Sequence, residues 1–490
     1  MKSREHMLTM LSVKGVLFVV FFCLVFQWSC TVKRPLVKAG SEVRADVVPV
    51  PAAQLNKRDV DFQSEFSKVF KHNVDDLVYP ELIRRFYERE NYQPVLISRF
   101  LSDHSIEGFL GYLSQAGRHG LNPELFGLTA IQKQYDQYLE QGAVSGKEGY
   151  RNSMELELSV ASALIKYSSV LQYGLADPAK ICPHYSTLTL RPDSAAISHI
   201  LQVQSLRKYL DSIQPKNRQY LALQRALNAE ARTAMKSKEE VCMALVVNLE
   251  RLRWKNQPSG QTLVRVNIAA FNLDVLNQGK SILQMKVCVG EKGEKETPQL
   301  NSMIYSVQVN PVWNIPQSIA RNETTKNAAE DRYYLANNNI NVYKKGKLIG
   351  DPESIDWSMA DPDEYSFKQQ PGEQNALGRI KFLFKNESSV YLHDTPLQSP
   401  FKKEMRAISH GCVRVEKPLE LVLALFGQND KYEQIKRAMS SGYPKAKFIG
   451  LPKPVPIWIT YFTAWADQSG LIHLYKDVYQ LDPLVYRTLL

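Results

Sequence analysis

The chain contains little cysteine and has no long run of apolar or basic residues. Its 490 residues include 6 cysteines, which are too few and too scattered for a fold held by a disulfide framework. No run of five Lys or Arg residues occurs and no nucleic-acid-binding motif is present, so we expect no nucleic-acid partner. No apolar run reaches the roughly 20 residues of a membrane-spanning helix. No internal repeat and no low-complexity tract is present, which argues against a repeat architecture.

These absences leave a globular protein of ordinary composition. Hydrophobic residues make up 44% of the chain and charged residues 23%, close to the averages for globular proteins. The 61 basic and 50 acidic residues give a net charge of +11. This charge suits an acidic polymer or an anionic membrane surface as a partner, but an excess of this size over the whole chain also fits an ordinary surface. The length predicts roughly two to four domains.

The N-terminus has the pattern of an export signal. Three basic residues precede a run of 12 apolar residues at 15–26, which is short for a membrane span and typical of a signal peptide. The run ends just before Ser29-Cys30, a pair similar to a bacterial lipoprotein cleavage site. We predict an export signal at 1–29 and lipidation of Cys30. The alternative is an uncleaved signal anchor with Cys30 unmodified. Both interpretations hold the mature chain in the periplasm, anchored to a membrane at its N-terminus.

Hydrophobic periodicity divides the rest of the chain into a helical part and a β-rich part. Residues 30–72 are polar with weak periodicity, and we predict a linker there. Between 73 and 240 apolar residues recur at helical spacing, which predicts an all-helical domain. Residues 241–490 predict a β-rich domain. The expected fold class is therefore α+β, with the helical domain first.

The β-rich part opens with two alternating segments. Residues 264–268 and 283–289 alternate apolar and polar side chains, and a turn sequence lies between them at 277–280. We predict that the two segments form a β-hairpin with one buried face. Further strands are predicted at 304–309, 379–384 and 390–393, and a helix from Pro418 to a stop at Gly427.

One segment interrupts this pattern. Residues 322–372 are rich in Asn, Asp and Tyr and show no clear strand periodicity. About 50 residues are too many for a plain loop in a compact domain, and such insertions are often lids. We predict a lid-like insertion here. The alternative is a peripheral element that takes no part in substrate binding.

The residues with the most chemistry occur together in the stretch 409–414, which reads Ser-His-Gly-Cys-Val-Arg. A thiol nucleophile needs a base and donors for an oxyanion. Gly411 allows a carbonyl group to approach the backbone closely, so the N–H groups of Gly411 and Cys412 are candidate donors. His393 lies upstream at the end of a predicted strand. Strand alternation puts Tyr391 and His393 on one face, which we expect to be accessible.

Two other interpretations of these residues stay open. Structural zinc sites use paired ligands at short spacing, and the remaining cysteines form no such pairs. A buried, inert cysteine is the second alternative. The residues alone favour thiol catalysis, and we expect no metal and no cofactor.

Taken together, the motifs resemble the L,D-transpeptidases of the YkuD type. The resemblance rests on the stretch 409–414, on Tyr391–Thr395, and on similar segments at 297–298, 310–316, 375–382 and 463–465. The helical part is similar to the scaffold domain of the large YcbB-like branch, through residues 86–94, 119–123 and 174–178. Three departures are visible. The small peptidoglycan-binding domain of that branch is missing, and Leu96 stands where Trp is common. The lipoprotein-like Cys30 is expected to take the place of the single-span anchor of some relatives.

The resemblance implies an enzyme that makes 3→3 cross-links in peptidoglycan. Cys412 would attack the amide after the third residue of a donor tetrapeptide stem and release the terminal D-Ala. The side-chain amine of an acceptor diamino acid would then take the acyl group from the thioester. His393 is implied as the proton donor and acceptor, and Asp394 as the group that orients it. The resemblance also implies inhibition by carbapenems.

A second set of residues is expected around the substrate. Arg414 could hold a carboxylate of the stem peptide, or it could form a salt bridge beneath the site. His410 is expected beside the pocket and not as the base, and Ser409 is expected to be a structural neighbour. Tyr391, Asn375 and Trp313 are each compatible with a position in the substrate groove or in the core. The set is Ser409, His410, Arg414, Tyr391, Asn375 and Trp313.

The same site admits other outcomes. With water as acceptor the enzyme would be an L,D-carboxypeptidase, and with a protein lysine it would link a protein to the wall. A non-enzyme alternative is a wall-associated scaffold, which the intact pair of His393 and Cys412 argues against. The choice of acceptor depends on groove shape, which a sequence does not show.

The N-terminal pattern gives a first testable prediction. We expect cleavage before Cys30 and acylation of its thiol and new amine, because two or three acyl chains hold a protein on a membrane where one is marginal. In a cell that makes the protein, Cys30→Ser should abolish both membrane association and labelling by a fatty-acid probe. A wild type and a variant that both stay on the membrane without label would instead show a signal anchor.

Overall fold

The computed structural model describes residues 60–141, 146–229 and 238–490. All of them lie within the unit formed by residues 49–490. The predicted export signal at 1–29, Cys30 and the predicted linker up to residue 59 lie outside the described residues. Within the described ranges, no helix is both long enough and apolar enough to cross a membrane.

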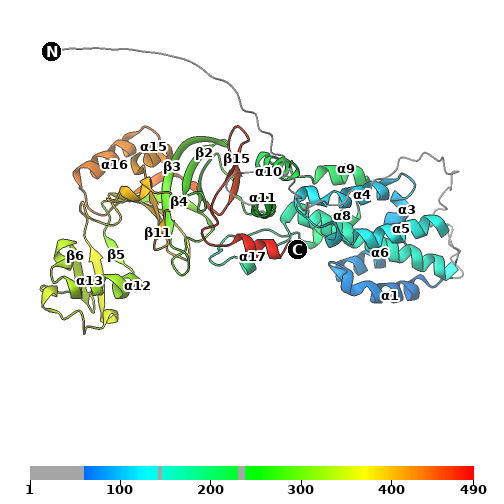
Figure 1. Ribbon diagram of the computed structural model, residues 1–490, viewed down its shortest axis with the longest axis horizontal. Coiled ribbons are helices and arrows are strands. Elements are labelled where there is room, and N and C mark those ends of the chain that lie inside the picture. Colours follow the sequence, from blue (N-terminus) through cyan, green and yellow to red (C-terminus); the bar gives the residue numbers. More distant parts are fainter. Residues whose placement is uncertain (1–59, 142–145, 230–237) are drawn as a thin grey trace, which may run out of the picture. The chain divides into compact units, whose positions relative to one another are not determined.

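The first part of the described chain is helical, as predicted, and the fold class is α+β. The long helix α6 is buried along most of its length and has α1, α3, α5 and α8 packed against it (Figure 1). Its centre carries consecutive apolar residues, which is the pattern of a helix surrounded on several sides. The helices are α1 (Phe62–Asn73), α2 (Pro80–Arg89), α3 (Val95–Phe100), α4 (Ser105–Ser114), α5 (Leu128–Gln141), α6 (Gly146–Tyr173), α7 (Pro178–Ile181), α8 (Ser194–Leu201), α9 (Leu206–Ser212) and α10 (Arg218–Asn228).

The prediction of a linker over 30–72 is wrong for its last residues. Helix α1 begins at Phe62, and the Asp61 side chain caps it by accepting from the Ser64 N–H at 3.2 Å. Phe66 and Val69 are buried in the helical core. Polar residues separate the few apolar positions of this segment, so its sequence is polar overall. Its apolar residues lie on one face of the helix, and this face packs against α6.

A buried carboxylate joins two of these helices. Glu157 in the middle of α6 is fully buried, and it accepts hydrogen bonds of 2.7 to 2.8 Å from the N–H groups of Val95, Leu96 and Ile97. It also accepts from the Tyr87 hydroxyl at 2.7 Å. The first N–H groups of a helix have no partner within the helix. Glu157 therefore satisfies the N-terminus of α3 from a distant part of the chain.

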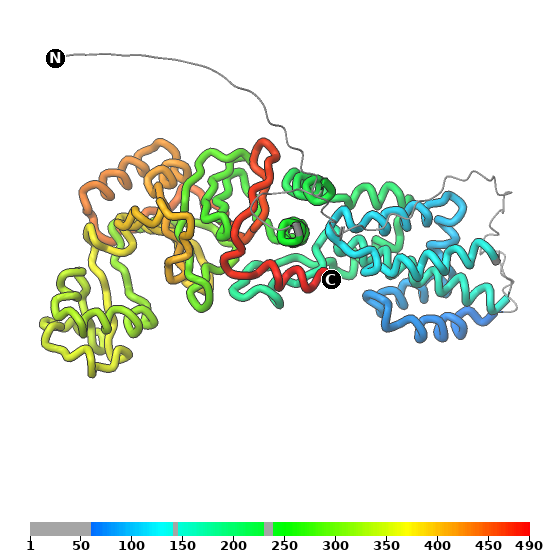
Figure 2. The backbone as a smooth tube through the Cα atoms, viewed as in Figure 1, coloured from blue at the N-terminus to red at the C-terminus, as the bar shows by residue number. Residues whose placement is uncertain are grey.

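Helix α11 (Lys238–Arg253) links the helical part to the β-rich part. It packs against α10, against β14 (Ala464–Ala466) and against the C-terminal helix α17 (Asp482–Arg487). Arg251 on α11 and Asp482 form a buried ion pair of 2.7 Å. The C-terminal segment, red in Figure 2, thus returns to α11.

Eight strands of the described chain close into a barrel. The order is β3-β12-β10-β9-β4-β13-β1-β2, and β2 pairs again with β3, while β11 adds to the free side of β3. β3, the first strand of this order, closes the barrel because it also pairs with the last. Its first half pairs with β2, and its second half pairs with β12 and β11. The strands are β1 (Thr262–Asn267), β2 (Asn272–Asn277), β3 (Lys280–Gly290), β4 (Leu300–Val309), β9 (Ile380–Phe384), β10 (Leu392–His393), β11 (Ala407–Ser409), β12 (Val413–Val415) and β13 (Lys447–Thr460).

The predicted hairpin is present with a different partner. The turn lies at 277–280, where Gln278 and Gly279 have positive φ of 47° and 76°, as tight hairpin turns require. The strand that pairs with 280–286 is β2, at 272–277, and not the segment 264–268. That first segment pairs with the other side of β2 and with β13. Alternation showed which residues face the core but not which strand lies next to which.

The predicted insertion at 322–372 does contain strands, which corrects the expectation of an irregular segment. A four-stranded sheet of order β5-β8-β6-β7 has its own apolar core, including Val342, Trp357 and Phe367. Its first strand begins at Trp313, so the module starts earlier than predicted (Figure 1). Its elements are β5 (Trp313–Ile315), α12 (Gln317–Ile319), the π-helical turn Ala320–Thr324, α13 (Thr325–Glu330), α14 (Tyr334–Asn337), β6 (Ile340–Lys344), β7 (Lys347–Leu348) and β8 (Tyr365–Gln369).

Two helices follow β12. Helix α15 runs over Pro418–Phe426 and ends at Gly427, as predicted from the sequence. Helix α16 (Asp430–Ser441) is capped by the Asn429 side chain. Both contribute buried apolar residues to the core of the barrel.

The buried carboxylate in α6 gives a stability prediction. Glu157→Ala would leave three buried N–H groups and the Tyr87 hydroxyl without their acceptor, and such losses cost about 3 kcal/mol or more in total. We expect a clearly lower midpoint of urea unfolding, followed by far-UV circular dichroism. Glu155→Ala, half-buried on the same helix, is the matched control and should shift the midpoint little. Equal effects of the two substitutions would contradict the role given to Glu157.

Candidate active site

Three neighbouring barrel strands line up a histidine between two cations. His393 on β10 pairs with Lys381 on the antiparallel strand β9 and with Arg414 on the parallel strand β12. Residues that are directly opposite on paired strands point to the same face of a sheet. The residues at the alternate positions, Phe382, Leu392 and Val413, are buried in the barrel core. Lys381, His393 and Arg414 therefore form one row on the opposite face.

Cys412 joins this face one step along the strands. It precedes Val413, whose N–H donates to the carbonyl oxygen of Tyr391 at 3.1 Å. Tyr391 in turn precedes Leu392, the strand partner of Val413. Tyr391 and Cys412 are thus neighbours across β10 and β12, beside the row that contains His393. The thiol of Cys412 is half-buried.

A backbone carbonyl fixes the tautomer of His393. Its Nδ1 lies 2.6 Å from the carbonyl oxygen of Asp394. Because a carbonyl only accepts, the proton is on Nδ1 and the lone pair is on Nε2. The carboxylate of Asp394 has another use, since it accepts from the N–H groups of Arg379 at 2.8 Å and Thr395 at 2.7 Å. Asp394 was expected to orient the imidazole, and the structure shows that its backbone carbonyl does so, not its side chain.

The electrostatic surroundings keep both His393 and Cys412 neutral at rest. Burial first, and then the charges of Arg414 and Lys381, lower the pKa of His393 to about 3, against the opposing hydrogen bond from Asp394. Burial raises the pKa of the Cys412 thiol, although hydrogen bonds from Tyr391 and the two cations oppose this. His393 is only 5% exposed, so the expectation of an accessible histidine is wrong. The site holds a thiol next to a neutral imidazole and not a charged pair.

Ser409 organises the loop before Cys412. Its hydroxyl donates to the carbonyl oxygen of Cys412 at 2.5 Å and accepts from the N–H of Gly411 at 3.2 Å. Gly411 has φ of +105°, a conformation that L side chains rarely adopt. The N–H of Gly411 is therefore engaged inside the loop, contrary to the expectation that it points at the oxyanion. Among the described residues, the N–H of Cys412 has no acceptor, which makes it the candidate donor.

A residue that sequence reasoning did not single out supports the same loop. The hydroxyl of Thr297 donates to the carbonyl oxygen of Gly411 at 2.8 Å and accepts from the N–H of Gly290 at 2.8 Å. Tyr479 completes the support, because its hydroxyl donates to the carbonyl oxygen of Gly290 at 2.7 Å and accepts from the Thr297 N–H at 3.2 Å. The strand end of β3 and the C-terminal region thus hold the loop from behind.

Tyr391 and Trp313 both lie at the site. The ring of Tyr391 meets that of His393 edge to face, with 5.7 Å between centroids. Burial and the proximity of Cys412 raise the pKa of the Tyr391 hydroxyl, which hydrogen-bonds both Cys412 and Trp313. Trp313 opens the insertion module. Through Tyr391, the insertion module is therefore connected to Cys412.

His410 and Asn375 do not contact the reacting groups. The Nε2 of His410 lies 2.6 Å from the carboxylate of Glu323 in the insertion module, so this ring points toward the module. Asn375 is buried, and its side-chain amide donates to the carbonyl oxygens of Pro311, Gln369 and Gln370. These bonds use both amide protons to close the module, which corrects the expectation that Asn375 binds substrate.

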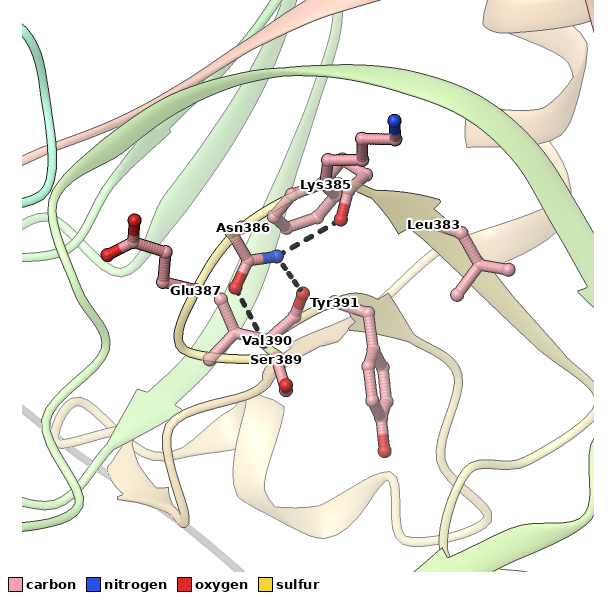
Figure 3. A pocket seen from close by; sticks show the side chains of 8 residues that line it. Leu383, Lys385, Asn386, Glu387, Ser389, Val390 and Tyr391 are labelled. Atoms are coloured by element: carbon pink, nitrogen blue, oxygen red, sulfur yellow. Dashed lines mark hydrogen bonds between the residues drawn. The ribbon is translucent and has the colours of Figure 1, made fainter.

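An open pocket lies beside the nucleophile. Its lining consists of residues 383–387 and 389–391 (Figure 3). Tyr391 lines this pocket and also lies next to Cys412. Asn386 holds the turn at its edge, because its side chain donates to the carbonyl oxygens of Phe384 and Val390 and accepts from the Val390 N–H. In the described part of the chain, no three His, Cys, Asp or Glu side chains gather where they could hold a metal ion.

Comparison with known proteins matches both parts of the chain. Residues 261–425 match the YkuD family, described as the L,D-transpeptidase catalytic domain, and residues 81–227 match the scaffold domain. A candidate L,D-transpeptidase of Haemophilus influenzae is 32% identical over 248 residues, which cover 50% of this chain and 50% of that protein. The chain thus spans about half the length of the curated relative that it matches.

Solved structures show weaker likeness. An L,D-transpeptidase from Mycobacterium smegmatis is 14% identical, with 42% of this chain and 62% of that chain covered and a TM-score of 0.21. L,D-transpeptidase 3 from Mycobacterium tuberculosis, in complex with a faropenem-derived adduct, is 11% identical, with 42% and 63% covered and a TM-score of 0.20. Scores this low support no conclusion about this chain, so the assignment rests on the family matches. Residues 261–425 belong to the L,D-transpeptidase catalytic-domain family of acyltransferases, and they follow a domain of the scaffold family.

Proposed function

We propose that the protein cross-links peptidoglycan stem peptides through a thioester on Cys412. The observation that carries the proposal is the fixed tautomer of His393, whose unprotonated Nε2 lies on the same face as the neighbouring Cys412 thiol. A neutral imidazole beside a neutral thiol is a general base ready to take a proton as sulfur attacks.

The first half of the proposed reaction acylates the enzyme. Nε2 of His393 takes the thiol proton while Sγ of Cys412 attacks the carbonyl carbon after the third residue of a tetrapeptide donor. The N–H of Cys412 is available for the oxyanion that forms. When the tetrahedral intermediate collapses, the imidazolium returns its proton to the leaving nitrogen. The products are free D-Ala and a thioester, and His393 is neutral again.

The second half transfers the acyl group to an amine. The side-chain amine of an acceptor diamino acid attacks the thioester carbonyl, and His393 takes the proton that the amine loses. The thiolate that leaves recovers this proton. The new amide is the 3→3 link. Water as acceptor would give an L,D-carboxypeptidase and a protein lysine would give attachment to the wall, and both reactions would use the same groups.

The insertion module supports transfer over hydrolysis. It contacts both sides of the nucleophile, through Trp313 to Tyr391 and through Glu323 to His410. A module held at these points can exclude water from a bound acyl-enzyme, which is how lids favour transfer. The proposed location is the periplasmic side of a membrane, and this rests on the N-terminal export pattern alone.

The proposed nucleophile gives the central test. Purified protein incubated with tetrapeptide-rich sacculi should yield 3→3 cross-linked muropeptides by mass spectrometry. Cys412→Ala should lower this activity by several orders of magnitude, because it removes the covalent route. Carbapenems present a strained carbonyl to the same thiol, so the intact wild type should gain one adduct that Cys412→Ala lacks. Cys288→Ala, at a buried free cysteine, is the control. Cross-linking by Cys412→Ala would sink the assignment.

The electrostatics of His393 predict the pH dependence of acylation. The base must be neutral, and a pKa lowered to about 3 keeps it neutral on mild acidification. Carbapenem acylation in a single turnover should therefore change little from about pH 7 to pH 5, whereas a base with the ordinary histidine pKa would lose about 25-fold in rate. His393→Ala should slow acylation ~10²–10⁴-fold, and His410→Ala far less. A steep loss of rate near the ordinary histidine pKa, or the reverse order of the two variants, would contradict these roles.

A further inference from the structure

The two cations beside His393 have no carboxylate partner. Within the described ranges, no Asp or Glu oxygen lies within 4 Å of Lys381 or Arg414, although both side chains are half-buried. Other sheltered arginines of the barrel and its neighbours have polar partners, and Arg406 donates to the backbone carbonyl oxygens of Val287 and Phe271. Arg251 binds Asp482 at 2.7 Å, and Arg265 binds Asp274 at 2.9 Å. The cations at the nucleophile are exceptions to the rule that sheltered charges are paired.

His393 and Cys412 supply no negative charge to balance the two cations. His393 is neutral, and the thiol of Cys412 is neutral at rest because burial raises its pKa. The nearest aromatic partner of Lys381 is Tyr391, with Nζ 5.3 Å from the ring centroid. A cation–π contact of this kind offsets only part of the cost of removing an ammonium group from water. Burial accordingly lowers the pKa of Lys381, while the nearby Cys412 opposes this.

The position of Lys381 is close to the bond that is cut in the proposed reaction. It is the strand partner of His393, on the β9 side away from Arg414. The same strand leads into the pocket that Leu383 and Tyr391 line (Figure 3). A substrate carbonyl within reach of Cys412 therefore has the Lys381 ammonium on one side. The terminal D-residue of a tetrapeptide donor carries its free carboxylate only a few covalent bonds from that carbonyl.

We propose that Lys381 is a specificity residue that binds the free α-carboxylate of the donor's terminal D-residue, the residue released when Cys412 is acylated. The proposal deepens the function proposed above and rests on it. Arg414 adds positive charge from the other side of His393. A donor extended by one more residue has an amide at this place, which offers no charge to Lys381. The pair of cations would thus select stems that end one residue after the scissile bond.

A purely electrostatic role is the competing explanation. Lys381 could act only by favouring the Cys412 thiolate, in which case its loss would slow acylation by every donor equally. A carboxylate-binding role predicts an effect that depends on the donor. The two explanations therefore predict different rates when donors with and without the carboxylate are compared in the wild type and in a variant without the Lys381 charge.

The experiment compares a tetrapeptide donor with its C-terminal carboxamide. Single-turnover acylation of Cys412 is followed by mass spectrometry of the quenched full-length protein. A charge-assisted hydrogen bond should favour the acid by about 10- to 100-fold in the wild type. Lys381→Met should slow acylation by the acid by this factor more than it slows acylation by the amide, so that the preference for the acid is lost, and Lys381→Arg should restore most of the preference. Lys436→Met, at an exposed position on α16, controls for the change in net charge.

Each result decides a different point. Measurable acylation of Lys381→Met by the amide also shows that the variant is folded and carries a working nucleophile. Equal rates for acid and amide in the wild type, or an equal slowing of both donors in Lys381→Met, would show that Lys381 does not bind the carboxylate while leaving the transpeptidase assignment intact. If a carbapenem labels Cys412 but neither donor acylates it, the proposed function itself fails and the role of Lys381 fails with it.

Discussion

The hydrogen bond between Nδ1 of His393 and the carbonyl oxygen of Asp394 determines what the site can do. It leaves the lone pair on Nε2, on a ring whose strand face Cys412 shares by register, so the imidazole can accept a proton without first changing its tautomer. The register of β9, β10 and β12 sets the rest, because it puts cations on both sides of the ring. Their field and the burial of His393 keep it uncharged, which is the form that a general base needs.

The catalytic loop depends on groups from distant parts of the chain. Thr297 and Ser409 hold the carbonyl and the N–H of Gly411, and the Tyr479 hydroxyl holds Thr297. Tyr479 lies just before α17, whose Asp482 is tied to Arg251 of α11 by a buried ion pair. Continuous contacts thus run from α11 through the C-terminal segment to the loop before the nucleophile. The helical part supports the geometry of the loop even though it supplies no reacting group.

The insertion module is an independent fold element that meets the site at a few polar contacts. It has its own apolar core, whereas its polar contacts with the site are the hydrogen bond between Trp313 and Tyr391 and the pairing of Glu323 with His410 and Lys295. Polar contacts of this kind are worth little at a surface.

The sequence by itself determined the α+β class and the strand face that His393 shares with Tyr391, and it pointed to the stretch 409–414 as the candidate site, because helical and strand periods and a short motif are local properties. The tertiary structure decided which strands are neighbours. Alternation assigns a side chain to a face but not to a partner, so the strand at 272–277 and the pairing of Lys381 with His393 were not foreseen. The same limit explains Gly411 and Asn375, whose polar groups are satisfied inside the protein by distant partners. Hydrogen-bond partners are set by long-range packing, and only the folded chain shows which polar groups are left for a substrate.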